Sequence, residues 1–169
     1  MNNVKNIVPG RIIPPAPPGW KNWEDLMELA LHEARNAGAA GEVPVGALVV
    51  SGNGSILARP ANAVESVRDP SAHAEILAIR EACRIVRNYR LEGCILLATL
   101  EPCLMCAGAI AHARLAGLVF GAEDKRAGAV VSCYEGLDQP FLNHRVWHMG
   151  GISATRSKAL LHDFFEKRR

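Results

Sequence analysis

The sequence predicts an α/β protein in which a three-layer α-β-α arrangement contains a mixed sheet of about five strands. Short apolar runs rich in β-branched residues alternate with longer segments whose apolar residues recur at helical spacing. Asn53-Gly54 separates two of the short runs and is typical of a hairpin, so this pair of strands should be antiparallel. The other runs are separated by helical segments, which implies a mixed sheet with helices on both faces.

Length and composition fit one globular domain. The chain has 169 residues, of which 49% are hydrophobic, enough for a single core. Four prolines between residues 14 and 18 indicate a flexible, Pro-rich arm over residues 1–20, and we expect the domain to span residues 21–169. Five cysteines, an odd number, argue against a disulfide framework. No segment has the character of a membrane span or a signal peptide, so we expect a cytoplasmic protein without membrane contact.

Charge is unevenly distributed along the chain. The formal net charge is +2, which is too small to indicate a partner by itself. Residues 141–169 hold six basic and two acidic residues, so this end carries +4 and the remainder carries −2. A basic C-terminal end is expected if it meets an anion such as a nucleic-acid backbone, although basic residues also complement the dipole at helix C-termini.

Capping residues, turn residues and periodicity place the individual elements. In the first half we expect a helix capped by Asn22 and ended by Gly38 and Gly41, strands over 45–50 and 56–57, and a loop over 59–70. In the second half we expect a helix from a Ser71 cap to about Val86, a buried strand over 95–100, a helix with Pro102 in its first turn that runs to about Ala113, a strand over 118–121, and a last helix over roughly 157–167.

Three residues of metal-binding type lie at the predicted starts of two helices. Cys103 and Cys106 are three apart in one first turn, and His73 lies in the first turn of the other helix. A helix N-terminus lowers the pKa of a thiol and so favours the thiolate that binds metal. Zinc accepts one imidazole and two thiolates as ligands, and a catalytic zinc site keeps a fourth position open for water.

Spacing alone leaves alternatives for this cluster open. Cys83 lies about three helical turns beyond His73 and cannot reach the same ion. Cys94 and Cys133 could each supply a fourth, structural ligand, and iron is also compatible with the ligand set. Taken alone, a His at a helix start is usually a surface residue or a cap, and a Cys-x-x-Cys pair is often incidental.

Glu75 favours a catalytic site over a structural one. It follows His73 by two positions, about 200° around a helix, but an ion beyond the helix end can lie near both side chains. A carboxylate there can take a proton from metal-bound water and pass it on. A Glu in a first turn usually only complements the helix dipole, so the combination of His-x-Glu with Pro-Cys-x-x-Cys is what indicates a site.

This combination, His73-Ala74-Glu75 followed by Pro102-Cys103-Leu104-Met105-Cys106, resembles the zinc-dependent nucleobase deaminases of the cytidine/deoxycytidylate deaminase superfamily. Within that superfamily the chain is similar to the bacterial tRNA-specific adenosine deaminase family from about Trp23 to the C-terminus. The resemblance implies a cytidine-deaminase-like fold. The segments that carry it are EVPVGALVV (42–50), DPSAHAEILAIR (69–80), NYRL (88–91), TLEPCLMCAGAI (99–110), FGAEDKRAGA (120–129), NHRV (143–146) and DFFEKRR (163–169).

The resemblance also implies a reaction, the hydrolytic deamination of adenosine to inosine at the wobble position of a tRNA anticodon, that of tRNA arginine. His73, Cys103 and Cys106 would hold one Zn²⁺ per subunit, with a water in the fourth position. The hydroxide formed there would attack C6 of the purine, and Glu75 would be the catalytic proton shuttle.

Further residues are expected, by the same resemblance, to bind the substrate. The partner would be a tRNA anticodon stem-loop, whose target base must be splayed out of its stack. Family members are homodimers, so a homodimer is expected here. Of two adjacent aromatic residues, we assign Phe164 to the core and Phe165 to stacking on a base. The substrate-binding residues implied are Asn62, Ala74, Asp124, Arg126, Asn143, His144, Arg145, Phe165 and Arg168.

Two other functions are compatible with the same residues. A guanine or cytosine deaminase acting on free bases would share the zinc pattern, but it would need neither the basic C-terminal end nor the NHRV segment. A non-catalytic, zinc-stabilised RNA-binding module would keep the metal ligands but would have no use for Glu75.

Overall fold

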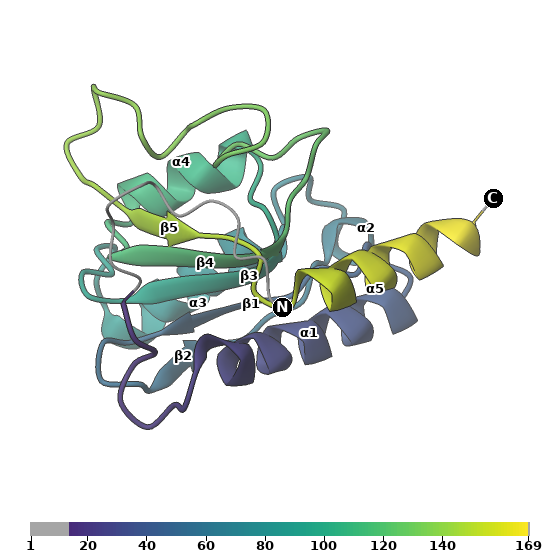
Figure 1. The fold of residues 1–169 in the computed structure, drawn as a ribbon, viewed down its shortest axis with the longest axis horizontal. Coiled ribbons are helices and arrows are strands. Elements are labelled where there is room, and N and C mark those ends of the chain that lie inside the picture. Colours follow the sequence, from purple (N-terminus) through teal and green to yellow (C-terminus); the bar gives the residue numbers. More distant parts are fainter. Residues whose placement is uncertain (1–13, 169) are drawn as a thin grey trace.

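A five-stranded sheet lies between two layers of helices in the computed structural model, which describes residues 14–168 (Figure 1). The strand order is β2-β1-β3-β4-β5. Apolar residues of α1 (Trp23–Ala39) and α5 (Ala154–Glu166) pack on one face of the sheet, and those of α3 (Ala74–Val86) and α4 (Leu104–His112) pack on the other. The predicted three-layer α-β-α fold is confirmed.

The sheet is mixed, as predicted. β1 (Ala47–Val50) pairs antiparallel with both β2 (Ile56–Ala58) and β3 (Ile95–Leu100). β4 (Gly117–Ala122) pairs parallel with both β3 and β5 (Trp147–Met149). The pairing therefore changes from antiparallel to parallel at β3. As a result, the carboxyl ends of β3 and β4 lie at the same edge of the sheet as the start of β1.

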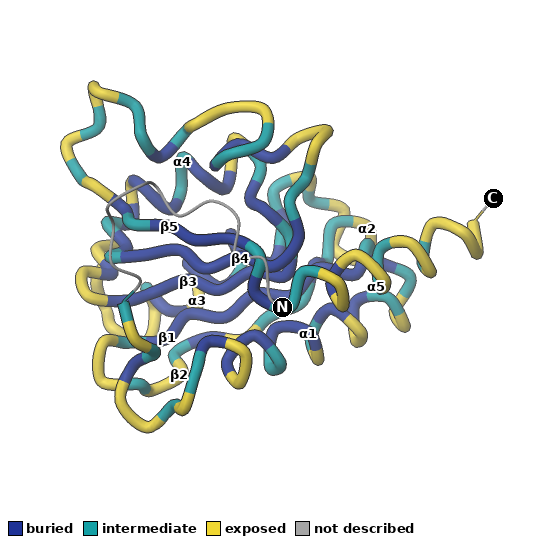
Figure 2. The backbone as a smooth tube through the Cα atoms, viewed as in Figure 1, coloured by how far each residue is buried: buried dark blue, intermediate teal, exposed yellow. Residues whose placement is uncertain are grey.

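Side chains of the strands alternate between two cores. In β3, Ile95 and Leu97 pack towards α1, whereas Leu96 and Ala98 pack towards α3 and α4. All four residues are buried, and the central strands form a continuous buried band between the helical layers (Figure 2). A continuous apolar run is the pattern of a strand buried on both faces, and the strand predicted over 95–100 is confirmed.

The predicted hairpin is present, whereas β5 had no specific prediction. The hairpin turn contains Gly54, whose φ of +90° is a conformation that glycine adopts without strain. β5 has only three residues and no β-branched residue. Parallel pairing with β4 and an edge-to-face contact between Trp147 and Trp23, with ring centroids 5.8 Å apart, hold it in place. Tertiary contacts, rather than local propensity, define this strand.

The helix α3 begins later than predicted. Its first residue is Ala74 and its N-cap residue is His73, so the prediction of a Ser71 cap is wrong. The hydroxyl of Ser71 instead donates to the side chain of Asp69 at 2.7 Å. His73 therefore has an extended backbone just before the helix and does not lie within its first turn.

The helix α4 also begins later than predicted. Cys103 is its N-cap residue and Leu104 its first residue, so placing Pro102 in the first turn is wrong. The Pro102 carbonyl accepts the N–H of Ala129 at 2.8 Å, and Cys103 forms an isolated antiparallel bridge with Gly128. These contacts to the segment after β4 hold the chain extended until Cys103.

The other two predicted helices differ from the predictions only at their ends, and one short helix was not predicted. Asn22 caps α1 as predicted, since its side chain accepts the N–H of Asp25 at 2.8 Å, but the helix continues past Gly38 to Ala39. A short helix, α2 (Val64–Val67), lies within the segment predicted as a loop. The last helix, α5, begins three residues before the predicted position.

The predicted arm lies mostly outside the described residues. Its described part contacts the domain: the indole N–H of Trp23 donates to the Pro14 carbonyl at 2.9 Å, and that of Trp20 donates to the Gly54 carbonyl at 2.8 Å. Residues 14–20 are thus held against the domain, while the boundary at residue 21 stays a prediction. Between residues 14 and 168 no helix is long and apolar enough to cross a membrane. The cytoplasmic location also stays a prediction.

Candidate active site

The three candidate metal ligands meet at one edge of the sheet. His73 directly precedes α3, whereas Cys103 follows β3 and directly precedes α4, whose first turn carries Cys106. The helices α3 and α4 pack against each other on the same face of the sheet. Their N-termini therefore bring the three side chains together beyond the carboxyl end of β3.

The geometry of the cluster fits a tetrahedral metal ion. Nδ1 of His73 lies 3.6 Å from Sγ of Cys103 and 3.5 Å from Sγ of Cys106, and the three ligand atoms all lie within 4.8 Å of one another. Tetrahedral zinc, with Zn–S bonds of about 2.3 Å and Zn–N bonds of about 2.0 Å, would separate nitrogen from sulfur by about 3.5 Å. Among residues 14–168 no fourth His, Cys, Asp or Glu joins this group, so one coordination position is left for a water.

The cysteines that the sequence left as possible fourth ligands lie elsewhere. Cys94 is buried in the core on the α3 and α4 side of the sheet, where burial raises the pKa of its thiol. The thiol of Cys133 is directed to the carbonyl of Lys125 at a distance of 3.3 Å. The donor set is therefore one imidazole and two thiolates, as zinc accepts in catalytic sites.

Protons are shared within the cluster. Hydrogen bonding from Cys106 lowers the pKa of the Cys103 thiol to about 4, and a hydrogen bond from His73 adds to this effect against the cost of burial. The hydrogen bond to Cys103 raises the pKa of His73. Sharing a proton with Cys103, together with burial, raises the pKa of Cys106. Metal binding replaces such shared protons, because the ligands must be thiolates and a neutral imidazole.

The Glu75 carboxyl group is buried beside the cluster. Glu75 is 4% exposed and lies in the first turn of α3, two residues after His73. Burial raises the pKa of its carboxyl to about 7, although its own backbone N–H and the charge of His73 act in the opposite direction. A carboxyl group with a pKa near neutrality can both take up and release a proton at pH 7.

A cleft of about 290 Å³ opens onto the cluster. His73, Glu75 and Cys103 line it together with Asn62 and Asp124. This volume is near the lower end of the range for small-molecule pockets, so the cleft suits one base rather than a folded RNA. The remaining lining residues are Glu42, Val43, Val45, Val64, Glu65, Leu100, Glu101 and Ala127.

A buried carboxylate holds Asn62 in one wall of the cleft. Asn62 is buried, and its Nδ2 donates to Oε2 of Glu42 at 3.3 Å. The Glu42 carboxylate also accepts the backbone N–H groups of Glu65, at 3.2 Å, and of Ser66, at 2.7 Å. Glu42 therefore joins the Asn62 segment to the start of α2.

A second buried carboxylate, that of Glu101, contacts the other wall. It accepts backbone N–H groups of the segment 124–132, including that of Asp124 at 3.0 Å. Neither Glu42 nor Glu101 was predicted as a functional residue, because a single Glu forms no pattern in the sequence. Only the position of Glu101 directly before the Pro-Cys-x-x-Cys motif could have drawn attention to it.

Two of the predicted substrate-binding residues, Ala74 and Arg126, are notable for their backbone N–H groups. Ala74 is the first residue of α3, where backbone N–H groups have no acceptor within the helix. Arg126 is exposed in the segment 124–132, and its N–H donates to Oδ1 of Asp124 at 2.9 Å. Their contacts with a substrate stay predictions.

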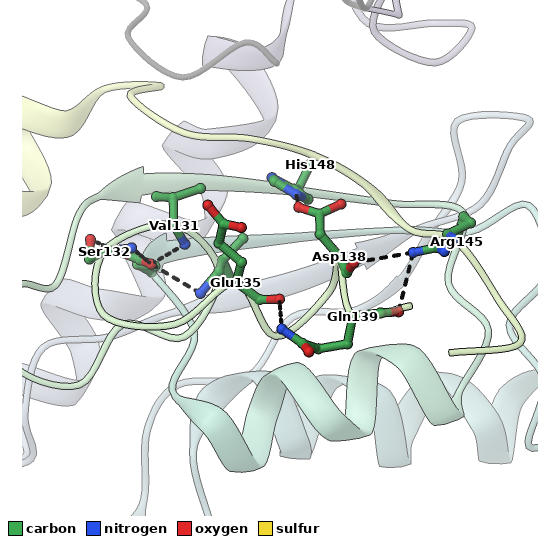
Figure 3. A network of polar contacts seen from close by, with 9 residues as sticks. Val131, Ser132, Glu135, Asp138, Gln139, Arg145 and His148 are labelled. Atoms are coloured by element: carbon green, nitrogen blue, oxygen red, sulfur yellow. Dashed lines mark hydrogen bonds and ion pairs between the residues drawn. The ribbon is translucent and has the colours of Figure 1, made fainter. Parts of the chain in front are cut away.

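Residues 143–145 lie at the opposite edge of the sheet from the cleft. They precede β5, whereas the cluster follows β3, and the two strands run in the same direction through β4. Nε2 of His144 lies 2.7 Å from the carbonyl oxygen of Leu115, before β4. Arg145 donates to two backbone carbonyls of the preceding loop (Figure 3). Within one subunit the structure does not bring these residues to the cleft.

The residues that follow α5, in contrast, contact the chain next to a residue that lines the cleft. Arg168 donates to the carbonyl of Gly41, the neighbour of Glu42, and its guanidinium carbon lies 4.1 Å from the ring centroid of Phe164. Phe164 also packs edge-to-face on Phe165, with ring centroids 5.3 Å apart, and Phe165 is 52% exposed. Phe164 is only half-buried and belongs to neither core, so its assignment to the core is wrong. The contact of Phe165 with RNA stays a prediction.

Known proteins share this fold and cluster. Residues 21–122 match the family model described as the cytidine and deoxycytidylate deaminase zinc-binding region. The chain is 47% identical to the tRNA-specific adenosine deaminase of Aquifex aeolicus (strain VF5), over 86% of this chain and 95% of that protein. A solved structure from work on A-to-I editing by tRNA:A34 deaminases has a TM-score of 0.78 and 44% identity, covering 81% of this chain and 99% of that chain.

Guanine deaminase from Nitrosomonas europaea is a more distant structural relative. Its TM-score is 0.68 at 26% identity, and the match covers 83% of each chain. Fold, cluster and family model together define a zinc-dependent hydrolytic deaminase. The chain belongs to the cytidine and deoxycytidylate deaminase family and, within it, groups with the tRNA-specific adenosine deaminases. The resemblance and the cytidine-deaminase-like fold predicted from the sequence are confirmed.

Proposed function

We propose that this enzyme deaminates adenosine to inosine at the wobble position of a tRNA anticodon, that of tRNA arginine. The observation that carries the proposal is the buried Glu75 carboxyl in the cleft lined by His73 and Cys103, two of the three residues of the His73, Cys103 and Cys106 cluster. A structural metal site has no use for a buried carboxyl beside an open coordination position. The tRNA-specific deaminases to which the chain is similar supply the substrate class.

The cleft residues have separate chemical roles in this proposal. One zinc ion per subunit, held by His73, Cys103 and Cys106, would polarise a water molecule and lower its pKa towards about 7. Glu75 would take the proton of the attacking water and deliver it to the ring nitrogen beside C6. The resulting hydroxide would add at C6. Glu75 would then take the proton of the new C6 hydroxyl group and pass it to the exocyclic amine, which leaves as ammonia. A carboxyl group with a pKa of about 7 suits both transfers.

Recognition of the base falls to the walls of the cleft. Asn62 and Asp124 line it on segments held by Glu42 and Glu101, so both side chains start from fixed positions. Asn62 would hydrogen-bond the purine edge. The cleft admits one base, and the wobble nucleotide would therefore enter only after it is turned out of its stack.

The RNA backbone would follow the basic end of α5. A groove between the ends of α1 and α5 is lined by three cationic side chains, those of Arg35, Lys167 and Arg168. Arg168 lies beside Gly41 at the rim of the cleft, so a phosphate bound there would be near the entering nucleotide. Phe165, exposed on the same end of α5, would stack on a flanking base.

A homodimer would bring residues 143–145 to the substrate. They lie at the opposite edge of the sheet from their own cleft, so contact with the same anticodon loop would have to come from a second subunit. The first turn of α4, beside Cys103, exposes Leu104 and Met105 and offers an apolar surface for association. Sedimentation of the purified enzyme at the mass of one subunit would contradict this assembly.

The test of the reaction is incubation with an anticodon stem-loop of tRNA arginine that carries adenosine at the wobble position, with inosine detected by sequencing. Glu75→Gln, which removes the ionisable group and preserves the side-chain shape, should lose about 10²–10⁴-fold or more in turnover and keep its zinc. Loss of zinc in Glu75→Gln would show that Glu75 supports the metal site rather than proton transfer. Full activity of Glu75→Gln would refute the proton shuttle.

The second candidate function is a deaminase of free bases. The structural similarity to a guanine deaminase favours testing it. Free guanine, cytosine and cytidine should be poor substrates compared with the stem-loop, because they cannot use the basic groove. Turnover of free guanine or cytosine with no reaction on the stem-loop would overturn the RNA assignment and leave the zinc chemistry intact. A non-catalytic RNA-binding module would bind the stem-loop and zinc without any turnover.

A further inference from the structure

The carboxylate of Glu101 accepts hydrogen bonds from several backbone N–H groups of the segment 124–132. Glu101 is 2% exposed. Its Oε1 accepts the backbone N–H groups of Val130 at 3.1 Å, Val131 at 2.8 Å and Ser132 at 2.9 Å. Its Oε2 accepts the N–H of Asp124 at 3.0 Å and the hydroxyl of Ser132. One side chain thus joins both ends of the segment 124–132.

This segment is the wall of the cleft that faces Asn62. Asp124 and Ala127 line the cleft, and the bridge between Gly128 and Cys103 ties the wall to a metal ligand. The wall packs directly on Glu101: a Cβ added at Gly128 would lie 2.4 Å from the carboxylate. The position of the wall is therefore set by the Glu101 carboxylate.

No neutral side chain of similar size could replace this carboxylate. A carboxylate accepts hydrogen bonds at both oxygens and donates none, whereas the amide of Gln has one accepting oxygen and a donating NH₂ group. In Glu101→Gln the NH₂ group would face N–H or O–H donors on one side of the wall. Buried donors left without an acceptor are costly, so the wall would move to satisfy them.

We propose that Glu101 is a positioning residue that fixes the segment 124–132 as the substrate-facing wall of the cleft and so sets the affinity for the RNA substrate. It takes no part in the chemical step. The inference rests on the proposed function only for the identity of the substrate. It follows that loss of the carboxylate changes KM far more than kcat, because the metal ligands and Glu75 keep their places.

The kinetic test is Glu101→Gln assayed with the wobble-adenosine stem-loop. KM should rise about tenfold or more, kcat should stay within about threefold, and the zinc content should not change, since one charged hydrogen bond corresponds to about this factor. Glu101→Asp, which keeps an acceptor-only carboxylate on a shorter side chain, should recover part of the affinity. Ser132→Ala removes only the hydroxyl contact and should raise KM less, in the same direction.

Asp138→Asn is the matched control. Asp138 lies in the same connection between β4 and β5, and its Oδ2 is 2.8 Å from Nε2 of the buried His148 (Figure 3), but it does not line the cleft. Its substitution should loosen the connection without changing KM. An equal rise of KM in Asp138→Asn would show general loosening of the connection and overturn the assignment to Glu101.

A second readout needs no activity. Lys125 and Arg126 are exposed in the wall, and trypsin cleaves after both residue types. Release of the wall in Glu101→Gln should speed cleavage at these positions at least severalfold, while Asp138→Asn cleaves there at the wild-type rate. If the wild-type enzyme did not act on RNA, the proposed function would fail, yet faster cleavage with full zinc content would still support the anchoring of the wall.

Two outcomes would overturn the proposal. One is an unchanged KM and an unchanged cleavage rate in Glu101→Gln. The other is loss of zinc together with activity, which would make Glu101 a support of the metal site. If Glu101→Gln does not fold, Ser132→Ala decides alone: a normal KM and a normal cleavage rate in that variant would overturn the proposal.

Discussion

At the scale of single residues, the metal cluster depends on the backbone just outside two helices. His73 and Cys103 are both N-cap residues with extended backbone, and only Cys106 lies within a helix. Both residues lie at a helix N-terminus, where negative charge is stabilised. This position, together with hydrogen bonding from Cys106 and His73, lowers the pKa of the Cys103 thiol and favours its thiolate.

Cys103→Ala tests this cluster. Zinc affinity should fall by more than about 100-fold, because even the loss of groups that only support metal ligands costs about 10–100-fold. Deamination should disappear with the zinc, and the thermal midpoint should drop, since metal binding contributes to folding. Metal analysis and a melting curve measure both effects. Cys133→Ala is the control, because Cys133 is exposed and lies outside the cluster. A Cys103→Ala enzyme with one tightly bound zinc would disprove the ligand assignment.

At the scale of elements, buried carboxylates accept backbone hydrogen bonds in the irregular segments around the cleft. Apart from the short helix α2, the segments 59–70 and 123–146 lie outside the named helices and strands, so many backbone N–H groups there need other acceptors. Glu42 serves the first segment and Glu101 the second. The cleft is thus built from irregular segments that are nevertheless held in place.

The stability of the enzyme in acid should report on Glu42. Burial alone would raise the pKa of its carboxyl, but hydrogen bonds from Ser66 and Glu65 lower it below the ordinary value of 4.5. A depressed pKa means that the stabilisation is complete above pH 4.5 and is lost as the pH falls through the lower, folded-state value. The free energy of unfolding of wild type should therefore approach that of Glu42→Gln below pH 4.5. Urea unfolding at pH 7, 5, 4 and 3.5 measures this, and a constant difference would contradict it.

The elements themselves show what could be predicted from the sequence. The strand 95–100 and the Asn53-Gly54 hairpin have strong local patterns, and both were placed correctly. The starts of α3 and α4 were placed too early, because contacts with Asp69 and with the segment after β4 decide them. The cluster of His73, Cys103 and Cys106 with Glu75 could be predicted from motif spacing, whereas the contacts of Glu101 are tertiary and leave no local pattern.

At the scale of the whole molecule, the basic end of α5 lies near the cleft. The net positive charge of the C-terminal segment, +4 in residues 141–169, includes Lys167 and Arg168 at the end of α5. This end of α5 lies beside Gly41, next to the cleft wall that carries Glu42. A long polyanion could therefore be held by α5 while one of its bases occupies the cleft.

Arg168→Ala tests this arrangement. Binding of the stem-loop should weaken, and the slope of log K against log salt should become shallower by about 0.7–0.9 for each phosphate that the variant no longer neutralises. Arg84→Ala, an exposed substitution in the last turn of α3, is the control and should leave the slope unchanged. Fluorescence anisotropy of labelled RNA at several salt concentrations measures both. Equal slopes for wild type and Arg168→Ala would assign Arg168 to the packing of α5 alone.

The contact between Trp23 and Trp147 has an optical consequence. All three tryptophans of the chain, Trp20, Trp23 and Trp147, belong to the core between the sheet and the α1 layer. Among residues 14–168, those that line the cleft include no tryptophan and no tyrosine. Intrinsic fluorescence therefore reports the packing of one helical layer and stays silent about the contents of the cleft. Unfolding of this enzyme can be followed by its own emission in the presence of substrate, whereas base binding needs an added label.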